Sequence, residues 1–199
     1  SKSEELSKSF SEYALIKFRV LVEIHWLIAL CDEPGIPEAK ELSDAQKIQL
    51  LDIYEKFTPE EAQKVKDIEK TTNHDVKAVE YYLKNRFEGT SLVSFSEFIH
   101  FACTSEDINN LAHALMLKSG ISVIEKSQNQ LLEALTKLAI EFKAFSMLSR
   151  THGQTASPTT LGKELAVFVN RLNRQSKKLK EIEILGKING AVGNFNAHY

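Results

Sequence analysis

Apolar residues recur at helical spacing through most of the second half of the sequence, and this pattern constrains the fold more than any other feature. They stand at i, i+3, i+4 and i+7 at Ile108, Leu111, Ala112 and Leu115, and recur between Leu131 and Phe142. This spacing places them on one face of a helix. The pattern predicts a helix of about 40 residues, about 60 Å long. Gly120 alone interrupts it, at a cost of about 1 kcal/mol.

A second amphipathic helix is predicted from Pro158 to about Leu185, with apolar residues at the same spacing between 161 and 172. Two long helices joined by a short segment form an antiparallel hairpin. Such a hairpin cannot bury both of its faces alone. We therefore expect the faces at 108–117 and 161–172 to pack against helices of other subunits or to form a large exposed apolar patch.

The first half of the sequence favours shorter helices. An almost continuously apolar run from about Ser9 to Cys31 is typical of a buried helix. The capping residues Ser43, Thr58 and Ser94 predict three further helix starts, and a helix is also predicted over 75–87.

No stretch alternates β-branched with polar residues, so no strand is predicted. The sequence therefore predicts an all-α fold. We expect a small N-terminal helical domain over 1–103, followed in 104–199 by the first long helices of a bundle.

Charge and cysteine content exclude several classes of protein. The net charge of −2 gives no electrostatic footprint for nucleic acid. Two cysteines, Cys31 and Cys103, form no disulfide framework and suit a reducing compartment. The polar start of the sequence has no signal-peptide pattern, and the most apolar stretch, 20–30, is too short to span a bilayer. We expect a cytoplasmic protein that binds neither nucleic acid nor membrane.

Two polar clusters stand at predicted helix starts, at 71–75 (Thr-Thr-Asn-His-Asp) and 104–110 (Thr-Ser-Glu-Asp-Ile-Asn-Asn). Free backbone N–H groups and the helix dipole favour anions at such starts. Ordinary N-capping is the simpler interpretation. For Thr104 and Ser105 we favour a function, because the cluster is unusually polar ahead of a core helix.

His152 stands in the polar segment 149–154, Ser-Arg-Thr-His-Gly-Gln, between the two long helices. Histidine is the one side chain whose unperturbed pKa lies near neutral pH, so a loop that holds it over a cleft makes it a candidate general acid or base. A lone loop histidine is more often merely solvated. The two polar clusters make the functional interpretation the better one.

A further segment, 187–194, contains two glycines and is either an anion-binding nest or an ordinary helix C-cap. It lacks the Gly-Lys-Ser/Thr ending of a phosphate loop. Metal-ligand spacing is missing from the histidines His25, His100, His113 and His198, so no metal site is predicted.

Four motifs, in this order, resemble the adenylosuccinate lyase family of the bacterial type, within the fumarase/aspartase superfamily. They are TTNHDVKAVEY (71–81), SEFIHFACTSEDINNLAHALMLK (96–118), LSRTHGQTASPTTLGKE (148–164) and IEILGKINGAVGNFNAHY (182–199). The resemblance runs from about Ser11 to Tyr199. It implies a long-helix bundle and a homotetramer whose active sites draw residues from three subunits.

The resemblance also implies roles for individual residues. His152 corresponds to a catalytic general acid that protonates the purine nitrogen as the C–N bond breaks. The residues implied to bind substrate are Asn73, His74, Asp75, Thr104 and Ser105. Gln154, Lys187 and Asn189 are given supporting roles.

The implied reaction is a β-elimination without cofactor, which releases fumarate from adenylosuccinate or from the succinylated aminoimidazole carboxamide ribotide. The family's opening Arg-Tyr motif and its catalytic serine loop have no counterpart here. We therefore expect an N-terminal fragment that is inactive alone. Two alternatives stay open: another lyase of the superfamily, such as one acting on argininosuccinate, and a non-catalytic helical assembly module.

Overall fold

The computed structural model describes residues 3–198, and their contacts form two compact units. The first unit contains the residues up to Gly120 together with those from Leu185 onward, and the second contains Ile121–Ile184. The long helix α6 (Ser105–Glu141) contributes to both units. The predicted domains, 1–103 and 104–199, stay a proposal.

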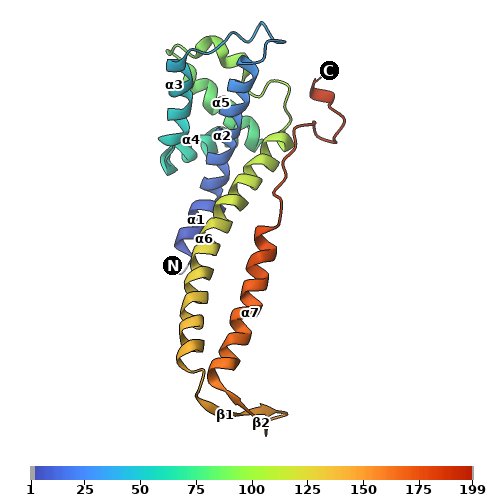
Figure 1. Ribbon diagram of the computed structural model, residues 1–199. Helices are drawn as coiled ribbons and strands as arrows, with labels where there is room; N and C mark the ends of the chain where they lie inside the picture. The colour runs from blue at the N-terminus through green and yellow to red at the C-terminus, as the bar shows by residue number, and fades with distance from the viewer. Residues whose placement is uncertain (1–2, 199) are drawn as a thin grey trace. The chain divides into compact units, whose positions relative to one another are not determined.

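The first unit is built around one buried helix. Its elements are α1 (Glu4–Phe10), α2 (Glu12–Cys31), α3 (Asp44–Glu55), α4 (Pro59–Thr72), α5 (Asp75–Phe87), the 3₁₀ helix η1 (Val93–Phe98) and the start of α6. Helix α2 packs against α1, α3, α4 and α5 (Figure 1). The core side chains include Val20, Ile24, Leu27, Leu50, Val65, Val79 and Leu83. Burying each such side chain stabilises the fold by about 1.5–3 kcal/mol.

Most of the predicted helix starts are confirmed by their caps. The hydroxyl of Ser43 accepts the N–H of Gln46 in a complete capping box, and Thr58 caps α4 ahead of a proline. The prediction at Ser94 is wrong. The short helix there is the 3₁₀ helix η1, it follows Leu92, and no side chain caps it.

The start of α6 is buried within the first unit. Ile108 is fully buried with Val22 and Val76, so the expectation that this part of the apolar face contacts other subunits is wrong. The glycine inside α6 also has a packing reason. A Cβ on Gly120 would lie 2.2 Å from ring atoms of Phe10, so any larger residue there would have to displace that ring.

The second unit holds the rest of α6, strands β1 (Ser146–Thr151) and β2 (Gln154–Thr160), and helix α7 (Leu161–Lys180). The all-α prediction is confirmed except for this pair of antiparallel strands, which the sequence analysis missed. Most residues of both strands are exposed. No buried face therefore imposed the alternation of apolar and polar residues from which a strand is predicted.

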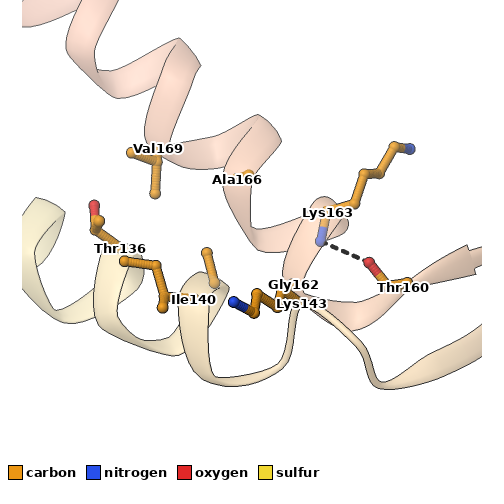
Figure 2. A pocket seen from close by; sticks show the side chains of 9 residues that line it. Thr136, Ile140, Lys143, Thr160, Gly162, Lys163, Ala166 and Val169 are labelled. Carbon is orange, nitrogen blue, oxygen red and sulfur yellow. Dashed lines mark hydrogen bonds between the residues drawn. The ribbon is translucent and has the colours of Figure 1, made fainter.

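The hairpin also shortens the second helix. Because Pro158 lies in β2, α7 begins only at Leu161, where the hydroxyl of Thr160 accepts the N–H of Lys163. Gly162 lies close to the end of α6, and a Cβ there would be 2.3 Å from the carbonyl oxygen of Ala139. Beside this contact the two helices border a hollow of about 390 Å³ (Figure 2).

The residues from Leu185 onward carry the short 3₁₀ helix η2 (Asn196–His198). Among the described residues, no helix is both long and apolar enough to cross a membrane.

Candidate active site

His74 and Ser105 lie together where α5 and α6 begin. The Nε2 atom of His74 is 3.3 Å from the hydroxyl oxygen of Ser105. His74 is the N-cap of α5, and its Nδ1 accepts the backbone N–H of Lys77 at 3.1 Å. A neutral imidazole whose Nδ1 accepts carries its proton on Nε2. His74 is therefore the donor and Ser105 the acceptor, which leaves the hydroxyl hydrogen of Ser105 free.

The residues beside His74 are held by the backbone and by one buried arginine. Asn73 ends α4 in the left-handed region, with φ 51°, and its N–H reaches the carbonyl of Glu69. The carboxylate of Asp75 accepts a hydrogen bond from Nη2 of Arg19 at 2.5 Å. Partial burial acts to raise the pKa of Asp75, but the Arg19 guanidinium and the N–H of Val76 outweigh it and lower the pKa.

Arg19 joins the starts of both helices. Its side chain is 7% exposed, and its Nε donates to Oδ1 of Asn109 in α6 at 2.8 Å. The guanidinium thus bridges Asp75 and Asn109. Arg19 belongs to none of the motifs from which site residues were predicted. A charged residue on a helix that is apolar almost all round was the signal that could have found it.

Asp107 fixes the backbone at the start of α6. It is fully buried, and its Oδ2 accepts the backbone N–H of Thr104 at 3.0 Å and the Thr104 hydroxyl at 3.2 Å. The hydroxyl hydrogen of Thr104 is therefore already used. Of the two predicted hydroxyl groups, only that of Ser105 keeps its hydrogen for a ligand.

The second oxygen of Asp107 binds the 187–190 segment. Oδ1 accepts the backbone N–H groups of Asn189 at 3.0 Å and Gly190 at 3.1 Å, and the ammonium of Lys187 at 3.1 Å. Burial acts to raise the pKa of Asp107, but these donors and the N–H of Thr104 lower the pKa to about 2. A nest was one of two interpretations of this segment, and its N–H groups bind a carboxylate of the same chain.

Asn110 adds a second connection to the same segment. Its side-chain oxygen accepts the N–H of Lys187 at 2.7 Å, and its amide donates to the Lys187 carbonyl at 2.9 Å. The Lys187 ammonium also donates to the carbonyl of Gly190. The side-chain oxygen of Asn189 is buried and has no hydrogen-bond partner within the described part of the chain.

A buried ion pair lies just before α6. Nδ1 of His100 is 2.5 Å from Oε1 of Glu23, whose side chain is fully buried. Burial raises the pKa of Glu23, although the pairing with His100 opposes this shift. Glu23 and Arg19 are one helical turn apart on α2, so this helix anchors both the approach to α6 and its first turn.

His152 and Gln154 belong to the second unit, at the tip of the β-hairpin. His152 and Gly153 form the two-residue turn, with φ values of 51° and 75°. Two successive positive φ values are those of a type I′ turn, which matches the twist of paired strands. Both His152 and Gln154 are exposed.

The five predicted binding residues thus lie at the starts of α5 and α6, and Lys187 and Asn189 are tied to the same place through Asp107. The apolar hollow between α6 and α7 contains none of the predicted site residues. Among residues 3–198 no group of three or more His, Cys, Asp or Glu side chains is placed to hold a metal ion.

Comparison with known proteins places these observations in a wider context. A family described as a lyase matches residues 1–199. The adenylosuccinate lyase of Haemophilus influenzae is 53% identical over 199 residues, which are 99% of this chain and 44% of that protein. The adenylosuccinate lyase of Escherichia coli K12 is 52% identical over 200 residues, with coverages of 99% and 44%. The chain therefore spans less than half the length of these relatives.

Solved structures with a similar fold include a fumarate lyase from Mesorhizobium, with a TM-score of 0.79 and 22% identity. It is matched over 98% of this chain and 44% of its own. The β-carboxy-cis,cis-muconate cycloisomerase of Acinetobacter calcoaceticus has a TM-score of 0.74 and 20% identity, with coverages of 97% and 44%. At these identities the likeness concerns the fold.

Proposed function

This chain belongs to the lyase family, and on that premise we propose that the whole protein is an adenylosuccinate lyase. Such an enzyme eliminates fumarate from adenylosuccinate to leave AMP, and acts likewise on the succinylated aminoimidazole carboxamide ribotide. Identities of 53% and 52% with two enzymes of that name support the choice of substrate. The elimination is redox-neutral, so it needs no redox cofactor, and the proposal includes no metal.

The observation that carries the proposal is the contact between His74 and Ser105, 3.3 Å apart. Two helices begin there, and each start presents the positive end of a helix dipole. The succinyl group carries two carboxylates, and removal of a proton beside one of them adds negative charge. Preorganised donors stabilise such charge. We assign no residue of this chain as the base.

The predicted binding residues divide by chemistry. Ser105, with a free hydroxyl hydrogen, would donate to a succinyl carboxylate, and Thr104 would contribute through its position at the helix start. Asp75 is ionised beside Arg19, so it can only accept hydrogen bonds and would face donor groups of the nucleotide. Asn73 and His74 would complete this side of the site.

We propose that His152 is the general acid, with Gln154 beside it in support. An imidazole at the tip of an exposed turn is surrounded by water, whereas a catalytic acid works best in an enclosed site. The proposal therefore includes a homotetramer in which neighbouring subunits cover the hairpin tip and share active sites. A cytoplasmic location is also proposed, and the free cysteines Cys31 and Cys103 suit it.

The test is an elimination assay on the whole protein, following fumarate release from adenylosuccinate. Argininosuccinate serves as the competing substrate in a parallel assay. Turnover of adenylosuccinate with no turnover of argininosuccinate is expected. Turnover of argininosuccinate alone would assign the protein to the other lyase, and no release of fumarate from either would leave the assembly module as the better interpretation.

A further inference from the structure

Asp107 connects the two segments that carry the proposed binding and supporting residues. Oδ2 holds the N–H and the hydroxyl of Thr104 at the start of α6, and Oδ1 holds Asn189, Gly190 and Lys187. We propose that Asp107 is a positioning residue for the elimination, which holds Thr104, and with it the neighbouring Ser105 hydroxyl, against the 187–190 segment. This inference rests on the proposed function.

The geometry suits positioning better than direct contact with substrate. Asp107 is fully buried, and its carboxylate accepts five hydrogen bonds from four residues of this chain. A carboxylate surrounded by its own donors has little capacity left for a ligand. Its charge would also repel the carboxylates of the substrate. Its influence therefore passes through the groups that it holds.

The two carboxylate oxygens bind two segments that are far apart in the sequence. Asp107 and Asn189 are 82 residues apart, so no local rule of helix geometry fixes the 187–190 segment at the start of α6. Without the carboxylate, the N–H groups of Asn189 and Gly190 lose their acceptor. The backbone N–H of Thr104 loses its acceptor as well. Displacement of binding groups by about 1 Å can lower the rate by about 100-fold.

The variant Asp107→Asn tests this role because it keeps the size of the side chain. With its oxygen toward Asn189 and Gly190, its NH₂ group would face the N–H of Thr104, and two donors would oppose each other. We expect kcat/KM for adenylosuccinate to fall by about 10-fold to 100-fold in the whole protein. Inhibition by fumarate, which probes the carboxylate-binding groups alone, should weaken as well.

Two control variants separate positioning from general loss of stability. Asp52→Asn makes the same chemical change at an exposed carboxylate paired with Lys56. Val65→Ala removes buried volume from the core between the helices of the first unit. Both should keep kcat/KM and the fumarate inhibition constant within about twofold of the wild type, although Val65→Ala lowers the melting temperature.

The comparison is made between variants that lower the melting temperature by similar amounts. If Asp107→Asn then lowers kcat/KM no more than Val65→Ala does, the inference is wrong. Should Asp107→Asn fail to fold, Asn110→Ala decides, because it frees the backbone N–H and carbonyl of Lys187 from α6 and leaves no buried charge unpaired. A fall in kcat/KM supports the inference, and an unchanged value overturns it. A wild-type protein that releases no fumarate refutes the proposed function itself, and no reaction is then left for Asp107 to serve.

Discussion

Nε2 of His74 donates to the hydroxyl oxygen of Ser105, 3.3 Å away, because Nδ1 of the same ring accepts the N–H of Lys77. The backbone thus donates to the imidazole, and the imidazole donates to the serine. The hydroxyl hydrogen of Ser105 therefore stays available for donation. The hydroxyl of its neighbour Thr104 donates to Asp107 instead.

Ser105→Ala removes the only one of these two hydroxyl groups whose hydrogen is free. We expect kcat/KM for adenylosuccinate to fall by about 10-fold to 100-fold, since one donor to developing charge is lost. Thr104→Ser keeps the hydroxyl that donates to Asp107 and serves as the matched comparison, with a change below about threefold. Steady-state assays of fumarate release measure both, and equal losses in the two variants would contradict the division of roles.

His152→Ala should reduce kcat by about 10²–10⁴-fold, because it removes the proposed general acid. His152→Gln keeps a hydrogen-bonding group of similar reach but donates no proton near neutral pH, so it should restore little. Circular dichroism should show an unchanged helix content, since the side chain is exposed at a turn. A His152→Gln variant with wild-type kcat would exclude this residue as the acid.

Arg19→Ala should destabilise the whole protein by about 3–5 kcal/mol, because it breaks a largely buried charged link between α5 and α6. The side chain of Asp75, however, is 45% exposed. Because solvent screens its charge, the expected loss of stability lies toward the lower end of this range. Denaturant unfolding measures the loss. The control is Arg86→Ala, at an exposed arginine 3.7 Å from Glu61, which should lower the free energy of unfolding by less than about 1 kcal/mol. An equal loss in Arg19→Ala and Arg86→Ala would show that the bridge from Arg19 to Asp75 and Asn109 adds no stability.

The buried carboxylate of Asp107 predicts a dependence of stability on pH. Its pKa in the folded state is about 2, below the ordinary value of 3.8. A lowered pKa stabilises the fold above pH 3.8, and that contribution is lost as the pH falls through about 2. The difference in free energy of unfolding between wild type and Asp107→Asn should be constant from about pH 7 to 5 and narrow below about pH 4. A difference that stays constant below pH 4 would contradict the lowered pKa.

Gly162→Ala should destabilise the second unit by about 1–3 kcal/mol, because overpacking against backbone is hard to relieve. The new Cβ would lie 2.3 Å from the Ala139 carbonyl oxygen and 2.6 Å from the Lys143 backbone. Gly35→Ala is the control, since only the flexible carboxylate of Glu33 lies near, at 3.3 Å. Thermal unfolding compares the two variants. Equal melting temperatures would show that α6 and α7 can move apart at little cost to make room for the new Cβ.

The helices and their caps could be predicted because they depend on residues close in sequence. Ser43 and Thr58 each bind an N–H three residues away, so a short stretch contains the whole interaction. Helix α5 was predicted with its observed bounds for the same reason. The strands on either side of His152 were missed, since their pairing depends on a turn and on no buried face.

Local sequence patterns predicted the helical fold class, most of the helix starts and, through the motifs, which residues to examine. The contacts of those residues depend on packing between segments that are far apart in the sequence. Arg19 meets Asn109 across 90 residues, and Asp107 meets Asn189 across 82. Local propensity carries no information about such pairs, because burial in the folded chain is what makes a lone charge costly and an internal partner necessary.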